Sequence, residues 1–175
     1  MNKRLFDSSI KETIVKYGRD IICSDDFLKT FEQTHHKCMT VGDHTLSVTA
    51  VAVRLCRSMN LNDDTTLRNV IMASLCHDLG IMGRHEKYRN NAQCFVAHPV
   101  DSVEAYRTLT GKENERIVDS ISCHMFPLRP LPPRYKEGWI LTMADKISAV
   151  RERLGKPPVS REERDEILAM AADMV

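Results

Sequence analysis

Residues 67–80, LRNVIMASLCHDLG, join an apolar helical pattern to a histidine and an aspartate that lie side by side. One face of the predicted helix is marked by residues at three- and four-residue steps: Leu67, Val70, Ile71, Ser74 and Leu75. Asp78 continues this face, so the spacing predicts a buried carboxylate next to His77. Because a His-Asp dipeptide arises often by chance, the pair alone does not establish a metal site, and the rest of the chain must decide.

The length, charge and cysteine pattern of the chain limit the class of protein. Its 175 residues fit one domain with a substantial core, which we expect over about 35–155 within a single domain of 1–175. The charge is balanced, with 25 Lys and Arg against 24 Asp and Glu, which argues against binding to a nucleic-acid polymer or an anionic membrane. The opening residues contain no long apolar run, and the six cysteines form no CxxC motif. We therefore expect a reduced, cytoplasmic protein without a membrane span.

Helical periodicity is present almost everywhere. Apolar residues at helical steps predict a helix over 43–58, and the Asn-Asp-Asp run at 62–64 supplies caps for a helix near 64–78. Four prolines in 125–134 predict a loop. No alternating strand of useful length is present, so the predicted fold class is all-α, a multi-helix bundle.

Further helices are predicted from their end signals. Pro99 suits the first position of a helix, and Gly111 suits the position after its end. Thr110 with Glu113, and Ser160 with Glu163, have the spacing of a capping box. An N-terminal helical segment is also expected. The other predicted helices lie near 99–109, 112–124, 136–153 and 160–174.

Four further residues stand where they could join the His-Asp pair. His44 lies on the apolar face of the 43–58 helix, although a lone histidine there is usually a satisfied core residue. His98 is predicted at the cap before Pro99, and His124 at a helix end before the proline loop. Asp145 lies in an otherwise apolar helix, where a buried carboxylate needs a cation, a hydrogen-bond network or a metal. Imidazole and carboxylate ligands without thiolates fit zinc, manganese or iron in a site that is not a structural zinc site.

The ordered series of His44, His77-Asp78, His98, His124 and Asp145 resembles the HD-domain superfamily of metal-dependent phosphohydrolases. The flanking sequences are also similar to the family's motifs. These are GDHTLSVTAVAVRL at 42–55, CHDLG at 76–80, AHPVDSVEAY at 97–106, and the segment 121–150 with its last histidine and Ala-Asp-Lys step.

The resemblance implies a compact HD-domain bundle and a set of ligands. In the family's extended version, which holds two metals, the first metal would be bound by His44, His77, Asp78 and Asp145. Asp78 would bridge to a second metal, which His98 and His124 would complete. Two divalent ions about 3.5–4 Å apart can activate a bridging water and clamp a phosphoryl group. We expect iron or manganese, with zinc, nickel, cobalt or magnesium as alternatives.

The sequence departs from many two-metal phosphodiesterases of this superfamily at Ile81, where they carry a phosphate-binding lysine. Arg84 or Lys87 could substitute, although solvated loop charges explain them equally well. His36 resembles a histidine found before the first ligand in a subgroup of small HD proteins, and it is a candidate general acid.

Other basic residues are candidate contacts for a substrate phosphate. Arg129 and Arg134 flank the proline loop beside His124, and Lys146 follows Asp145. As catalytic residues we name Asp78 and His36.

The leading interpretation is a phosphohydrolase in which a metal-activated hydroxide attacks a small, nucleotide-like phosphate mono- or diester. One alternative is a di-iron oxygenase that acts on a small polyol or phosphonate, and another is a non-catalytic metabolite sensor. Metal identity separates the first two, because dioxygen activation needs redox-active iron. The expected partner is a small molecule, with no nucleic-acid polymer and no membrane, and a homo-oligomer is possible.

Overall fold

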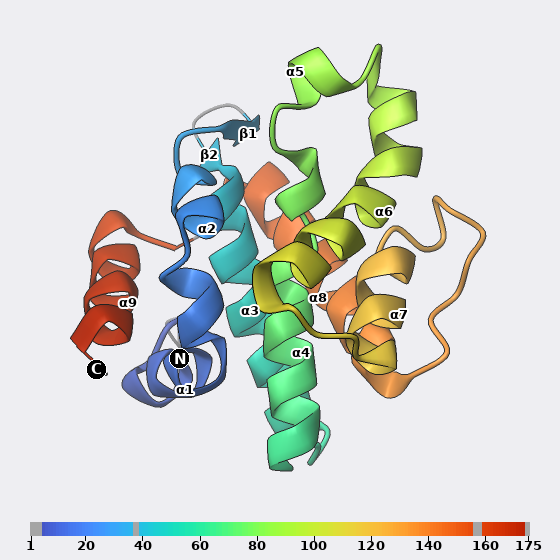
Figure 1. The fold of residues 1–175 in the computed structure, drawn as a ribbon. Helices are drawn as coiled ribbons and strands as arrows, with labels where there is room; N and C mark the ends of the chain where they lie inside the picture. Colours follow the sequence, from blue (N-terminus) through green and yellow to red (C-terminus); the bar gives the residue numbers. More distant parts are fainter. Residues whose placement is uncertain (1–4, 37–38, 156–158, 174–175) are drawn as a thin grey trace.

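The computed structural model describes residues 5–36, 39–155 and 159–173 as a bundle of helices (Figure 1). The long helices form the body, and a short 3₁₀ helix, η1 (Leu79–Ile81), follows the His-Asp pair. The helices are α1 (Ser8–Ile22), α2 (Asp25–Lys29), α3 (Val41–Ser58), α4 (Asp64–Cys76), α5 (Arg84–Lys87), α6 (Asn91–Thr110), α7 (Glu115–Cys123), α8 (Lys136–Arg153) and α9 (Arg161–Asp173). The all-α prediction is confirmed.

The described strands form one short antiparallel hairpin. It pairs β1 (Thr34–His36) with β2 (Met39–Thr40) directly before α3. Two strands of three and two residues are too short to bury a face, so the hairpin does not alter the fold class.

Two of the predicted helix starts are confirmed by their caps. Asp63 accepts a hydrogen bond from the backbone N–H of Thr66 and begins α4. Ser160 and Glu163 form the predicted capping box of α9, with side-chain to backbone distances of 3.0 and 3.2 Å. The predicted helix over 136–153 matches α8, and residues 125–134 form a loop as expected.

The predicted start at Pro99 is wrong. Pro99 lies inside α6, which begins eight residues earlier, at Asn91. Asn90 accepts a hydrogen bond from the backbone N–H of Gln93, so an ordinary N-cap opens the helix. Proline removes one helical hydrogen bond, and the twenty-residue helix tolerates this loss. His98 is therefore an interior residue of α6 and not a cap.

The predicted capping box of Thr110 and Glu113 is also wrong. Thr110 ends α6, and its hydroxyl donates to the Tyr106 carbonyl. Asn114 caps α7 in their place, because its side chain accepts from two backbone N–H groups of the first turn. Glu113 forms an ion pair with Arg107. Asparagine is a better N-cap than threonine, so the helix begins at Asn114.

The core is built around α3, which packs against α1, α4 and α8. Its residues are buried on nearly all sides, which is typical of a central helix. In Figure 1, α9 lies beside α1 at the edge of the bundle, where the Arg19 guanidinium donates to the Ala171 carbonyl at 2.9 Å. Among the described residues, no helix combines the length and apolar character needed to span a membrane.

Candidate metal centre

Six side chains that are far apart in the sequence converge in the interior of the bundle. They come from α3, from the segment after α4, from α6, from the end of α7 and from α8. They form two groups of three, and within each group the potential ligand atoms all lie within 4.8 Å of one another. The His44 cluster contains His44, His77 and Asp145, and the His98 cluster contains Asp78, His98 and His124.

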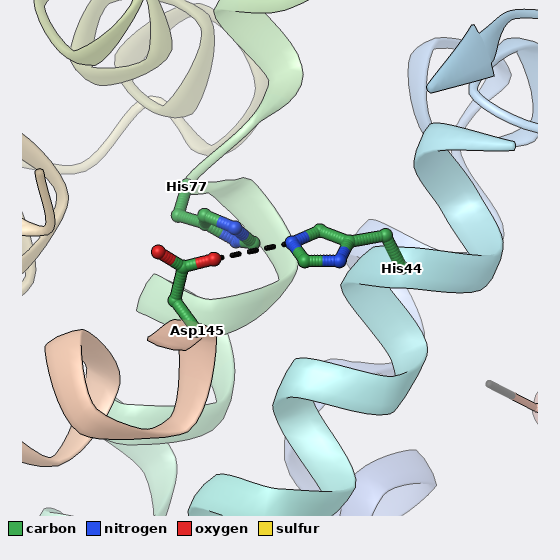
Figure 2. A group of neighbouring side chains, drawn as sticks. All are labelled: His44, His77 and Asp145. Carbon is green, nitrogen blue, oxygen red and sulfur yellow. Dashed lines mark hydrogen bonds and ion pairs between the residues drawn. The ribbon is translucent and has the colours of Figure 1, made fainter. Parts of the chain in front are cut away.

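The His44 cluster combines His44 of α3, His77 directly after α4 and Asp145 of α8 (Figure 2). Its closest pair of atoms is His44 Nε2 and Asp145 Oδ1, which are 3.2 Å apart. His77 Nε2 is buried and has no hydrogen-bond partner in the described part of the chain. A buried nitrogen without a partner is costly, and a cation at this position would remove the cost.

The His98 cluster places two imidazoles against the Asp78 carboxylate. His98 Nε2 and His124 Nε2 are 3.0 Å apart, and both imidazoles are almost fully buried. Asp78 Oδ1 lies 3.4 Å from His98 Nε2 and 3.8 Å from His124 Nε2.

Asp78 lies between the two clusters and presents a different oxygen to each. Its Oδ1 faces the His98 cluster, whereas its Oδ2 lies 3.5 Å from His77 Nε2 and 4.0 Å from His44 Nε2. Asp78 is 5% exposed, so its carboxylate is buried together with these rings. A carboxylate in this position can ligate one cation with each oxygen.

The four imidazoles share one orientation, with Nδ1 bound to an acceptor and Nε2 directed at the centre. His77 and His124 each follow the last residue of a helix, and their Nδ1 atoms lie 2.7 Å from carbonyls three residues back. His98 Nδ1 lies 2.8 Å from the Cys94 carbonyl, and His44 Nδ1 lies 2.8 Å from Glu152 Oε1. Because these partners only accept, Nδ1 of each ring carries a proton, and Nε2 is the nitrogen that faces the centre as a potential ligand.

This donor set fits divalent cations. Without an ion or an extra proton, the Nε2 lone pairs of His98 and His124 would face each other at 3.0 Å. Two nitrogens that bind one ion at about 2.0–2.1 Å are about 2.9–3.4 Å apart at ligand angles from 90° to tetrahedral. The observed separation falls in this range. Divalent cations commonly bind such mixed imidazole and carboxylate ligands.

The electrostatics differ between the two clusters. Burial opposes a charge on His44, yet its hydrogen bonds with Asp145 and Glu152 raise its pKa to about 10. Burial also opposes the charge of Asp145, but His44 and Lys146 hold the pKa of that carboxyl well below its ordinary value. Burial, with the nearby His77 and His98, lowers the pKa of His124 to about 3. The metal-free His44 cluster therefore holds a proton that a cation must displace, whereas His124 is neutral.

Gly80 explains how α6 approaches the His-Asp pair. A Cβ atom at this glycine would lie 2.4 Å from both the His98 carbonyl oxygen and the Ser102 nitrogen. Its own N–H donates to Ser102 Oγ at 2.9 Å, and the Tyr88 hydroxyl donates to its carbonyl at 2.8 Å. The absence of a side chain thus brings His98 within reach of Asp78.

Of the basic residues named from the sequence, Lys146 lies next to the centre. Its Nζ donates to Asp145 Oδ2 at 2.7 Å and to the His124 carbonyl at 3.2 Å. Lys87 forms an ion pair with Asp101 on α6 at 3.1 Å.

The two arginines of the proline loop are bound to α7. Arg134 pairs with Asp119 and Glu115, and it lines a groove of about 590 Å³ beside α7. Arg129 donates weakly to the Ser122 carbonyl at 3.4 Å. The structure does not bring these arginines to the two clusters, and their contact with substrate stays a prediction.

A smaller polar cavity of about 160 Å³ lies between α5 and the start of α6. Arg84 lines it together with Arg89, which was not named from the sequence. Cys94 also lines it, and the Cys94 carbonyl is the acceptor for His98 Nδ1. The cavity is thus one helical turn from the His98 cluster.

Two further residues, His36 and Glu152, bear on the metal centre. His36 belongs to β1, but its side chain lies outside the described residues, and its proposed role as a general acid stays a prediction. Glu152 was missed in the sequence, although it lies on the same face of the helix as Asp145, seven residues further on. The seven-residue spacing from Asp145 was the feature of the sequence that could have indicated Glu152.

Comparison with known proteins supports the family suggested by the motifs. The family model of the HD domain matches residues 41–150, which is more than half of the chain and includes both clusters. No curated protein and no solved structure matched the chain. From the extent of the family match, we conclude that the chain belongs to the HD domain family.

Proposed function

We propose that this protein is a phosphohydrolase that cleaves a small phosphate mono- or diester at a centre of two divalent metal ions. The observation that carries the proposal is the position of Asp78, which directs one carboxylate oxygen to each cluster. Membership of the HD domain family supports it, because this family consists mostly of metal-dependent hydrolases.

In this proposal His44, His77 and Asp145 hold one ion, His98 and His124 hold the other, and Asp78 contacts both. When bound, two divalent ions supply Lewis acidity that activates water and neutralises charge on a phosphoryl group. The protein fixes the ligands in advance, since each Nδ1 already has its acceptor. Lys146 restrains Asp145 through Oδ2 and leaves Oδ1 directed at His44.

The charges around the small polar cavity support an anionic substrate. Arg84 and Arg89 line it, and none of the described lining residues is an aspartate or glutamate. No ion pair with a carboxylate is present for Arg84 or Arg89 among the described residues. Arg84 Nε donates to His85 Nε2 at 3.4 Å, and the other guanidinium nitrogens can bind a substrate phosphate.

The test begins with protein purified without chelators and without air, whose metal content is measured by elemental analysis. We expect two equivalents per chain. The manganese-loaded protein should hydrolyse p-nitrophenyl phosphate or bis(p-nitrophenyl) phosphate, and Asp78→Ala should abolish this activity. Asp20→Ala is the matched control, because Asp20 is an exposed aspartate of α1 outside both clusters and outside the small polar cavity. Iron-loaded protein that consumes dioxygen with a polyol or phosphonate, and hydrolyses neither ester, would identify the di-iron oxygenase instead.

A further inference from the structure

We propose that Glu152 is a positioning residue that makes the His44 cluster the tighter of the two metal positions, so that it fills first. This inference rests on the two-metal centre of the proposed function. It concerns the order and strength of metal binding, which can be measured without any substrate.

The starting observation is an asymmetry among the four imidazoles. Three of them direct Nδ1 to a neutral backbone carbonyl, whereas His44 directs Nδ1 to the Glu152 carboxylate at 2.8 Å. Both side chains of this pair are buried, with 2% of His44 and 9% of Glu152 exposed. A hydrogen bond to an ionised acceptor is stronger than one to a neutral carbonyl. It also increases electron density on the other ring nitrogen, which strengthens that nitrogen as a metal ligand.

One helix holds both sides of the His44 ring. Asp145 and Glu152 are seven residues apart on α8, which is close to two full turns, so they share one face of the helix. Asp145 Oδ1 faces Nε2 of His44, and Glu152 Oε1 faces its Nδ1. The ring is thereby fixed in orientation and tautomer. Glu152 lies just outside the residues 41–150 that the family model matches, so the match itself assigns it no role.

The distribution of charge around the two clusters also favours tighter metal binding in the His44 cluster. The His44 cluster has a carboxylate of its own, Asp145, and Glu152 stands directly behind one of its ligands. The His98 cluster has no carboxylate other than Asp78, which lies between the clusters. Lys146 partly offsets Asp145 through Oδ2. Within the described chain no lysine or arginine forms an ion pair with Glu152, so its charge acts on His44.

The experiment is a calorimetric titration of the full-length, metal-free protein with manganese(II). It gives separate dissociation constants for the first and the second equivalent of metal. Glu152→Gln keeps an oxygen acceptor but removes the charge, and Glu152→Leu removes both. Glu162→Gln is the matched control, since Glu162 is exposed in the first turn of α9. We expect the first equivalent to weaken about 10-fold in Glu152→Gln and up to about 100-fold in Glu152→Leu. The second equivalent and the control should stay within threefold of the wild type.

A structural role alone would give a different pattern. Loss of packing around Glu152 would lower the melting temperature of the metal-free protein and weaken both equivalents together, and that result would overturn the proposal. An unchanged first constant in Glu152→Gln would overturn it too. Where the leucine variant does not fold, the glutamine variant carries the test.

The role of Glu152 and the proposed function can be contradicted separately. Protein that binds two equivalents in the expected order, yet hydrolyses no phosphate ester, contradicts the proposed function and leaves the role of Glu152 standing. Protein that hydrolyses esters and fills both positions with equal affinity contradicts the role of Glu152 alone.

Discussion

His98 and His124 direct their Nε2 atoms at each other at 3.0 Å, while the Nδ1 atom of each ring is bound to a backbone carbonyl. The carbonyls hold the rings in place whether or not a ligand is present. The two lone pairs avoid repulsion when both bind one cation. The arrangement of the two rings therefore fits the metal-bound state. The same argument applies to His77, whose buried Nε2 has no hydrogen-bond partner among the described residues.

Removing single ligands should separate the two metal positions. His98→Ala deletes a residue of the His98 cluster, so we expect a loss of about one equivalent of metal per chain. Asp78→Ala removes the carboxylate that faces both clusters, and we expect both equivalents to be lost. Elemental analysis after gel filtration measures the count, with Asp20→Ala as the control. Equal losses in His98→Ala and Asp78→Ala would contradict the bridging role of Asp78.

Gly80→Ala should damage the His98 cluster through the backbone. The added Cβ would lie 2.4 Å from backbone atoms of His98 and Ser102, which cannot rotate away. We expect a loss of about 1–3 kcal/mol in the free energy of unfolding, measured by urea denaturation, and weaker binding of the second metal equivalent. Gly83→Ala is the control, because its Cβ meets no atom within 4 Å and the substitution costs about 1–2 kcal/mol through the positive φ alone. If both variants bind metal like the wild type, Gly80 does not set the position of His98.

The sequence was sufficient where the signals were local. The helix that contains His44 and the helix over 136–153 were predicted to within two residues, because the helical periodicity that identifies them is local. The ordered histidines and aspartates were found because the motifs are short and keep their order. These signals identify which residues meet, although they do not give the distances between them.

The errors and omissions have physical reasons. Pro99 was read as a helix start because proline favours that position, but the cap at Asn90 and the packing of α6 outweigh one missing hydrogen bond. The contact between Glu152 and His44 joins residues that are 108 positions apart, so the helix face shared with Asp145 could indicate Glu152 but not its partner. The approach of α6 to Gly80 depends on tertiary packing in the same way.

Metal binding should release a proton from His44. Its pKa in the metal-free protein is raised to about 10, so the ring is protonated at neutral pH, and a metal ion must displace that proton from Nε2. His124, with a pKa of about 3, is already neutral and releases none. Between about pH 7.5 and 9, the affinity for the first equivalent should therefore rise about tenfold per pH unit. Calorimetry in buffers with different ionisation enthalpies counts the released protons, and a count near zero would contradict this assignment.

The same raised pKa predicts how the stability of the metal-free protein depends on pH. The folded state binds the His44 proton more tightly than the unfolded state, whose histidine titrates near its ordinary value of 6.5. The stabilisation is complete below that value and is lost as the pH rises toward about 10. Urea denaturation at about pH 7 and pH 9.5 should show the loss in wild type, and His44→Gln should show a smaller one. A wild-type free energy of unfolding that stays constant over this interval would exclude a protonated His44.

Arg84 and Arg89 should contribute to substrate binding more than to the chemical step. They line a polar cavity next to Cys94, one turn of α6 from the His98 cluster, and neither forms an ion pair with a carboxylate within the described chain. Arg84→Gln and Arg89→Gln should each raise KM for a phosphate ester about tenfold and change kcat less than threefold, because a charged hydrogen bond contributes about 1.5–3 kcal/mol. Arg161→Gln, which removes an exposed arginine of α9, is the matched control. A fall in kcat without a change in KM would place these arginines at the reacting phosphoryl group, and no change in either constant would show that the cavity does not bind substrate.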